Sequence, residues 1–300
     1  MDSLIKAEIK KRFAGRSESG RLFHGRGHCF PGLEDVLVDW YDPVMLVTLY
    51  QQRSELWLRE LVELLTAELD GVKTIVLQER FLKYSPSRIL FGSLPEDVYA
   101  LENGLKYRLC LNQSQNIGFF PDMSAARAFV RKRAAGRKIL NLFAYSCSFS
   151  VAAIAGGAHQ VVNLDMSCNA LTLGRLNHQI NSLDQRKASF MALEIFRSFS
   201  KLRKLAPFDL IICDPPAEQG KNFRAEKDWP KLVRKLPSLL RAGGEMMLCL
   251  SSPHLSPKYL ENLISKNCPQ ARLLQTFQAG IGFPEIDQEK GLNVLFYRIG

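Results

Sequence analysis

Three acidic residues, Asp165, Glu194 and Asp214, each follow an apolar segment of the length expected for a buried strand. Ligands of open α/β sheets bind outside the carboxyl ends of the strands, so we expect the three carboxylates to face one crevice. One such acid is expected by chance because turns favour aspartate, whereas three in order favour a nucleoside site. In such a site Asp165 would bind the ribose hydroxyls and Met166 would pack on the adenine. Glu194, or the backbone beside it, would receive the adenine amine.

The sharpest local signal is the pair of prolines, Pro215 and Pro216, directly after Asp214. Proline lacks a backbone N–H and fixes its φ angle, so the pair holds the chain extended immediately after the strand. Such a turn would present its carbonyl groups and the Asp214 side chain rigidly at a reaction centre. The alternative is a rigid loop without a chemical role.

The stretch from Arg137 to Ser167 has to position the first of these acids. It predicts a strand over 139–143, a tight turn over 144–148, a helix over 149–155 and a strand over 161–164 that ends at Asp165. This order is a βαβ unit, but it lacks the glycine fingerprint of dinucleotide-binding proteins. S-adenosylmethionine (SAM) carries a ribose and no pyrophosphate, and therefore needs no such glycines. Taken alone, the stretch fits an ordinary βαβ unit with a solvated Asp165 equally well.

Three segments follow from the hydrophobic pattern of the whole chain. Residues 1–20 predict a basic helical N-terminus, and residues 21–111 predict a small α+β domain of strands with one helix. From residue 112 to 300 helices alternate with apolar strands, which predicts an α/β domain with a mainly parallel, doubly wound sheet.

Composition narrows the class of protein. The 300 residues are 46% hydrophobic and 23% charged, and no apolar run approaches the ~20 residues of a membrane span. The N-terminal stretch lacks the apolar core of a secretory signal. Seven cysteines, without a Cys-x-x-Cys pair, indicate reduced thiols of a cytoplasmic protein and no metal site. The net charge of +10 favours a polyanionic partner such as RNA.

Four motifs occur in a fixed order: N-L-F-x-Y from Asn141, N-L-D-M-S from Asn163, D-L-I-I-C-D-P-P from Asp209 and L-L-R-A-G-G from Leu239. Together they resemble the class I SAM-dependent methyltransferases, and more narrowly the bacterial large-subunit ribosomal RNA methyltransferases I and K. The resemblance implies a Rossmann-like fold over residues 112–300, SAM as the cofactor, and RNA, most narrowly ribosomal RNA, as the substrate. It leaves open whether the protein is a monomer or a homodimer.

The resemblance also implies roles for individual residues. The turn of Asp214, Pro215 and Pro216 would be the catalytic element, and no metal is expected. The residues implied in cofactor binding are Asp122, Phe143, Tyr145, Ser146, Cys147, Asp165, Met166, Ser167, Glu194 and Asp214.

This sequence departs from the family pattern at three positions. Cys147 replaces a glycine in the first loop, and Ser124 replaces an arginine two positions after Asp122. Ser251 replaces the nucleophilic cysteine of the cytosine-methylating members, and Cys249 is expected to be a core thiol. Methylation of carbon 5 of cytosine needs a thiolate adduct. We therefore expect direct methyl transfer to a nitrogen, or to another centre that needs no adduct.

Two alternatives remain at this point. The three departures also suit a catalytically degenerate methyltransferase fold that binds RNA or a protein partner. Several basic residues after the D-P-P turn would hold RNA phosphates beside the site, or would form a solvated helix face. They are Lys221, Arg224, Lys227, Lys231, Arg234 and Lys235.

Overall fold

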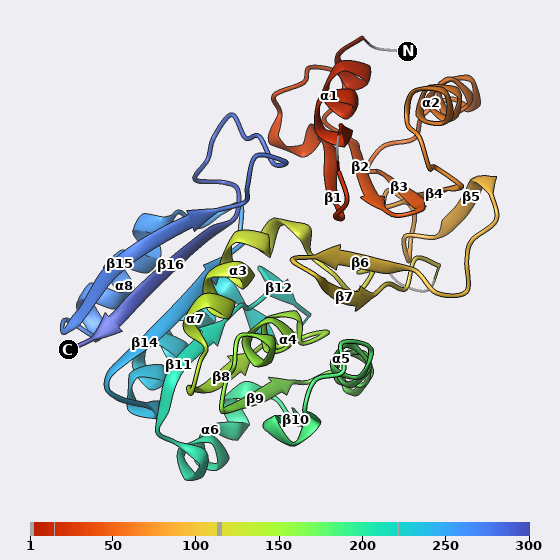
Figure 1. Cartoon of the computed structure of the whole chain (residues 1–300). Coiled ribbons are helices and arrows are strands. Elements are labelled where there is room, and N and C mark those ends of the chain that lie inside the picture. The colour runs from red at the N-terminus through yellow and green to blue at the C-terminus, as the bar shows by residue number, and fades with distance from the viewer. Residues whose placement is uncertain (1–2, 15, 113–115, 221) are drawn as a thin grey trace. The chain divides into compact units, whose positions relative to one another are not determined.

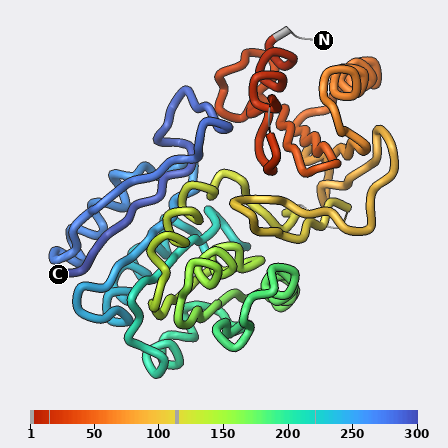
Figure 2. The backbone as a smooth tube through the Cα atoms, in the orientation of Figure 1, coloured from red at the N-terminus to blue at the C-terminus, as the bar shows by residue number. Residues whose placement is uncertain are grey.

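The computed structural model describes residues 3–14, 16–112, 116–220 and 222–300, which form two compact units. Unit 1 holds the described residues up to Asp122 together with Gly280–Ile286, and unit 2 holds Met123–Ala279 together with Asp287–Gly300. After Ala279 the backbone therefore leaves unit 2, adds a short segment to unit 1 and returns (Figure 2). The domain limits predicted at residues 20 and 111 stay predictions.

Unit 2 is built on a seven-stranded sheet with the order β10-β9-β8-β11-β14-β16-β15 (Figure 1). The strands are β8 (Lys138–Leu142), β9 (Gln160–Asp165), β10 (Ala188–Ala192), β11 (Phe208–Cys213), β14 (Leu240–Leu250), β15 (Ala271–Gln278) and β16 (Asn293–Ile299). Only β16 is reversed within this sheet, because it pairs antiparallel with both β14 and β15. The predicted mainly parallel sheet is confirmed.

Helices cover both faces of this sheet, as its strands require. In β8, Ile139 contacts one apolar cluster and its neighbour Leu140 contacts the other, because successive side chains of a strand point to opposite faces. One layer holds α3 (Ser124–Arg133), α4 (Ser148–Ala155) and α5 (Cys168–Ile180), and the other holds α6 (Ile195–Leu205), α7 (Ala225–Lys235) and α8 (Pro257–Asn267). The sheet is therefore doubly wound, as predicted.

Two of these helices begin at capping side chains that directly follow strands. Ser167 precedes α5, and its hydroxyl oxygen accepts the Ala170 N–H at 3.2 Å. Glu194 precedes α6, and its carboxylate accepts the N–H groups of Phe196 and Arg197, both at 2.9 Å. Such side chains satisfy donors that the first helical turn leaves without partners. Both helix starts are thereby fixed at the carboxyl edge of the sheet.

The strand order of unit 2 reverses between β8 and β11. From β8 the chain adds β9 and β10 on one side, and later adds β11 and β14 on the other. The Asp214 N–H, directly after β11, donates to the Leu142 carbonyl oxygen at the end of β8, at 3.4 Å. Ligands of doubly wound sheets bind at such a reversal, outside the carboxyl ends of the strands.

Unit 1 is an α+β assembly with its own core. A five-stranded sheet follows the chain order β1 (Gly20–His24), β2 (Val36–Tyr41), β3 (Val44–Leu49), β4 (Thr74–Glu79) and β5 (Ser87–Gly92). Its apolar face is covered by α1 (Ser3–Phe13) and by α2 (Glu55–Glu68), which connects the parallel strands β3 and β4. A separate hairpin is formed by β6 (Tyr99–Glu102) and β7 (Leu105–Arg108).

The segment Gly280–Ile286 is bonded into unit 1. The Ile286 N–H donates to the Gly27 carbonyl oxygen at 2.9 Å, and Nη1 of Arg12 donates to the Ile281 carbonyl oxygen at 2.8 Å. His24 lies between Arg21, which donates to its Nδ1 at 2.7 Å, and Glu285, which accepts from its Nε2 at 3.1 Å. A neutral histidine suits this order, and burial together with nearby arginines lowers the pKa of His24 to about 3.

Two further features concern the described residues alone. None of their helices has the length and apolar character needed to cross a membrane. They also contain no group of three or more histidine, cysteine, aspartate or glutamate residues arranged to hold a metal ion.

Candidate cofactor-binding site

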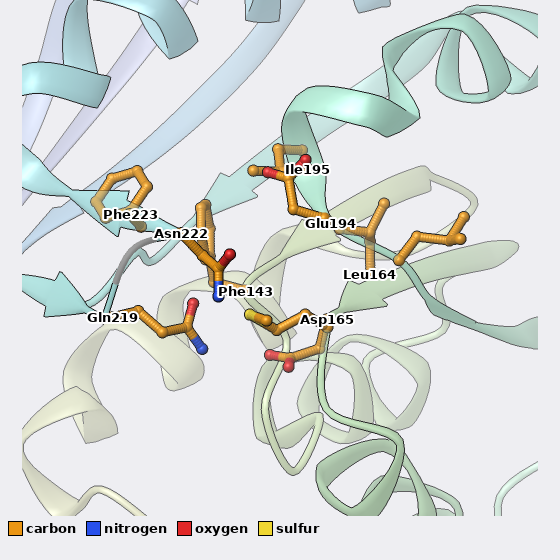
Figure 3. Close-up of a pocket in the computed structure, with 10 residues that line it drawn as sticks. Phe143, Leu164, Asp165, Glu194, Ile195, Gln219, Asn222 and Phe223 are labelled. Atoms are coloured by element: carbon orange, nitrogen blue, oxygen red, sulfur yellow. The ribbon is translucent and has the colours of Figure 1, made fainter.

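Unit 2 contains a pocket at the carboxyl ends of β8, β9 and β10 (Figure 3). Its lining residues are Phe143, Leu164, Asp165, Met166, Leu193, Glu194, Ile195, Gln219, Asn222 and Phe223. Four of them, Phe143, Asp165, Met166 and Glu194, are residues for which the sequence predicts a cofactor contact. The structure brings these four together, while their contacts with a cofactor stay predictions.

Asp165, the last residue of β9, is held by two backbone donors. Its Oδ2 accepts the Tyr145 N–H and its Oδ1 accepts the Ser167 N–H, both at 2.8 Å. A carboxylate offers about four acceptor positions, so two backbone donors leave acceptor capacity on both oxygens. The side chain lines the pocket and is half-buried. Two adjacent oxygens with spare acceptor capacity fit the paired hydroxyls of a ribose.

Glu194 has a structural role that was not predicted from the sequence. Both of its carboxylate oxygens accept N–H groups at the start of α6, as described above. A negative charge is also favoured there by the helix dipole. An acid immediately before a predicted helix is a capping signal, so this role was detectable in the sequence. The predicted contact of Glu194 with an adenine amine would use acceptor capacity that the cap leaves over.

The pocket walls are mostly apolar and suit a flat ring. Leu164 and Ile195 are buried in the floor, and the rings of Phe143 and Phe223 meet edge to face with centroids 5.1 Å apart. Met166 is 40% exposed at the rim. Aromatic and thioether side chains of this kind bind aromatic rings by dispersion and by edge contacts.

A short hairpin supplies the side of the pocket that lies away from β9 and β10 (Figure 3). It consists of β12 (Glu218–Gln219) and β13 (Phe223–Arg224). Gln219 and Asn222 contribute amide groups to the lining, and each amide offers both a donor and an acceptor. These two residues were not predicted from the sequence, because only their position after the D-P-P turn connects them with the site.

The loop Phe143–Cys147 between β8 and α4 is strained. Phe143, Tyr145 and Cys147 have φ angles of 57°, 46° and 60°, in the left-handed region that non-glycine residues avoid. Each such residue costs about 1–3 kcal/mol unless its surroundings compensate. The Ala144 N–H donates to the Leu164 carbonyl oxygen at 3.1 Å, and the Tyr145 N–H donates to Asp165. The end of β9 therefore holds the loop.

Cys147, at the position where the resemblance implies a glycine, packs away from the pocket. It is fully buried against Ala144 and Leu171, with Phe190 beside them, and is not among the lining residues. Burial raises the pKa of its thiol well above the usual value, and the Asp165 carboxylate adds to the effect. An ideal Cβ built on Gly174 of α5 would lie 2.5 Å from Sγ of Cys147. The absent side chain at Gly174 thus makes the space that Cys147 fills.

The remaining predicted site residues lie elsewhere. Ser167 is the cap of α5, and Tyr145 and Ser146 belong to the strained loop. Asp214, Pro215 and Pro216 follow β11 at the point where the strand order reverses, outside the lining of this pocket. Asp122 belongs to unit 1, and its cofactor contact stays a prediction. Lys221 lies outside the described residues.

We expect Gly174→Ala to destabilise the protein by about 1–3 kcal/mol, because the new methyl group overlaps Cys147 in a closed core. The loss should appear although alanine favours a helix over glycine by up to about 1 kcal/mol. Adding Cys147→Gly should recover most of it, since the clashing atoms are removed and glycine accepts the left-handed φ. Urea unfolding of both single variants and the double variant measures the coupling. A double variant whose loss equals the sum of the single losses would contradict this packing account.

Two curated relatives match most of this chain, and the match covers only part of each relative. A protein named ribosomal RNA large subunit methyltransferase from Deinococcus radiodurans is 28% identical over 262 residues, 83% of this chain and 64% of the relative. One named ribosomal RNA large subunit methyltransferase I from Serratia proteamaculans is 30% identical over 79% of this chain and 61% of the relative. The chain therefore spans less than two thirds of the length of these curated relatives.

A solved structure matches nearly the whole chain. The crystal structure of SMU.776 complexed with SAH, S-adenosylhomocysteine, superimposes with a TM-score of 0.88 at 26% sequence identity. The match covers 98% of this chain and 79% of that chain. The model of one protein family also matches residues 20–298. With that match, and with a doubly wound sheet that carries a pocket lined by Asp165, this chain belongs to the S-adenosylmethionine-dependent methyltransferase family, as its motifs predict.

Proposed function

We propose that this chain binds SAM with its adenosine in the pocket beside Asp165 and transfers the methyl group to a base of RNA. The observation that carries the proposal is the Asp165 carboxylate, held by two backbone N–H groups at the rim of an apolar pocket. Charged hydrogen bonds to a ribose diol and an apolar slot for a base are the two features that adenosine recognition needs.

The remaining residues would orient the reaction partners. SAM, when bound, supplies an electrophilic methyl group, and the enzyme's contribution to such a displacement is mainly orientation and exclusion of water. With adenosine at the ends of β9 and β10, the point between β8 and β11 where the strand order reverses stays available for the methyl group and the target base. There Asp214, half-buried, and Pro215, buried, begin the turn after β11. We assign these two residues the role of placing the target base. A base within a duplex would first have to be flipped out of the stack.

The cysteines of β11 and β14 support a transfer without a covalent adduct. Cys249 in β14 is fully buried in the cluster on the α3 and α4 side of the sheet. Cys213 is also fully buried, and burial, with Asp214 as a second cause, raises the pKa of its thiol well above the usual value. The exposed residue after β14 is Ser251. A nitrogen, or another centre that accepts a methyl group directly, is therefore the proposed target.

RNA is the proposed substrate class because of the positive charge of the chain and the names of its curated relatives. The chain carries a net charge of +10, and Lys227 and Arg234 of α7 are exposed. Lys231 is less available, since its Nζ pairs with Asp228 at 2.6 Å. Both curated relatives described above are named as large-subunit ribosomal RNA methyltransferases, which makes ribosomal RNA the first RNA to test. A cytoplasmic location and a monomeric or homodimeric state stay predictions.

The non-catalytic alternative depended on Ser124, Cys147 and Ser251. Cys147 is accommodated by Gly174 and lies outside the pocket, so it does not obstruct a cofactor there. Ser251 bears on the target atom and not on cofactor binding. No observation in the pocket favours the non-catalytic alternative over the enzyme.

Asp165→Asn should weaken SAM binding about tenfold to a hundredfold, because it removes the charge from both ribose contacts. The substitution keeps the shape of the side chain and one acceptor oxygen for the loops. Isothermal titration calorimetry with the purified protein measures the affinity. Asp184→Asn is the matched control, since Asp184 caps the turn before β10 and lies outside the pocket. A folded Asp165→Asn protein that binds SAM as tightly as wild type would refute the ribose assignment.

Replacing Lys227 and Arg234 by alanine should lower the salt dependence of RNA binding, by about one unit of slope for each phosphate that these side chains neutralise. The paired Lys231 should contribute less. Fluorescence anisotropy of a labelled ribosomal RNA fragment between low and moderate salt gives the slope. A Lys258→Ala and Lys266→Ala variant of α8 removes equal charge elsewhere. Equal slopes for the α7 variant and wild type would identify α7 as a solvated face only.

RNA containing 5-fluorocytosine should form no covalent complex with this protein in the presence of SAM. Trapping requires a thiolate that adds to carbon 6 of the ring, and Cys213 and Cys249 are both fully buried. A denaturing gel detects the adduct. A complex that forms with wild type and disappears in Cys249→Ala would restore the cytosine chemistry.

A further inference from the structure

The strained loop is held from behind by one side chain of α5. Nδ2 of Asn177 donates to the Ser146 carbonyl oxygen at 3.0 Å, and Asn177 is fully buried. Ser146 lies between Tyr145 and Cys147, two of the loop residues with left-handed φ angles. A hydrogen bond to the carbonyl between them fixes the orientation of the peptide group that joins Ser146 to Cys147.

The helix that carries Asn177 is itself fixed by buried polar groups. The neighbouring His178 donates from Nδ1 to the Gly174 carbonyl oxygen at 2.7 Å, and its Nε2 accepts the Ser150 hydroxyl of α4 at 3.0 Å. The Ser150 oxygen accepts Nδ2 of Asn163 in β9 at 3.0 Å. Burial lowers the pKa of His178, which keeps the ring neutral and able to accept at Nε2.

The same chain of bonds reaches the strand from which the loop emerges. Nδ2 of Asn141 in β8 donates to Oδ1 of Asn163 at 2.9 Å. Asn141, Ser150, Asn163 and His178 are each at most 1% exposed. Buried polar groups without partners are costly, so a connected network of this kind has one favoured arrangement. It sets α5 against β8, β9 and α4, and thereby sets the position of Asn177 relative to the loop.

We propose that Asn177 is a positioning residue for the loop Phe143–Cys147, and through it for the part of SAM beyond the adenosine. This inference rests on the proposed function. Of the loop residues only Phe143 lines the adenosine pocket at the ends of β8, β9 and β10, and the loop continues from β8, the strand beside the reversal. The methionine portion of SAM must extend from the ribose in that direction. The loop whose carbonyl Asn177 holds is the backbone that this portion meets.

Because Asn177 and Asp165 act at the ends of different strands, changes at these residues should affect SAM and adenosine binding differently. Asn177 acts on the loop after β8, whereas Asp165, at the end of β9, acts on the ribose. A change at Asn177 should therefore affect binding of SAM more than binding of adenosine, which lacks the methionine portion. A general loss of stability would instead weaken both ligands together, so the ratio of the two affinities separates positioning from a purely structural role.

Asn177→Asp tests the proposal with nearly unchanged shape. It replaces the donor by an acceptor that faces the Ser146 carbonyl oxygen. Asn181→Asp is the matched control, because Nδ2 of Asn181 donates at 2.7 Å to the Asn177 carbonyl oxygen, one helical turn away from the loop contact. Calorimetry with SAM and with adenosine gives the affinity ratio for wild type and each variant. Asn177→Ala supplies the same measurement without an added charge if the Asp variant does not fold.

We expect Asn177→Asp to weaken SAM binding about tenfold or more and adenosine binding less than about threefold, as for the loss of one buried hydrogen bond. Asn181→Asp should leave the ratio of affinities as in wild type. A folded Asn177 variant with the wild-type ratio would overturn the inference. Wild-type protein that binds neither ligand would instead refute the proposed function, so the two failures are distinguishable.

Discussion

The site depends on one carboxylate that joins two loops. Asp165 receives the Tyr145 N–H from the loop after β8 and the Ser167 N–H from the turn after β9. The first loop contains three left-handed residues, and the second starts α5. Because Asp165 also lines the pocket, the geometry of the loops and the position of the proposed ribose contact are set together. The pocket is therefore preorganised by its own binding residue.

Helix α5 serves as the support behind this arrangement. It begins at Ser167 beside Asp165, makes room for Cys147 at Gly174, and donates from Asn177 to the loop. His178 then bonds it to α4. These contacts explain how the loop accommodates Cys147 at a position where the resemblance implies a glycine. The cysteine occupies space that a side chain on α5 would otherwise fill, and the strain in the loop is balanced by hydrogen bonds from β9 and α5.

Strong local patterns were enough to predict the sheet and its acids, but not the whole site. The apolar run from Phe208 to Cys213, which ends sharply at Asp214 and two prolines, favours a strand with those bounds, and β11 has them. The hairpin with Gln219 and Asn222 was missed, since its two-residue strands are too short to show a periodic pattern. The exposed strand Ser87–Gly92 was missed for a related reason: it lacks a buried face to create a pattern. The residue pattern over 107–111 favours a strand there, but the strand in this region is Leu105–Arg108, placed by its pairing with β6.

The most direct test of the proposed site is a crystal structure of this protein with S-adenosylhomocysteine bound. We predict that both ribose hydroxyls lie within about 3 Å of the Asp165 carboxylate, as in charged hydrogen bonds. We also predict that the adenine ring lies between Met166 and the Phe143 and Phe223 side of the pocket. A ligand whose ribose lies away from Asp165, or whose adenine binds outside this pocket, would contradict the assignment.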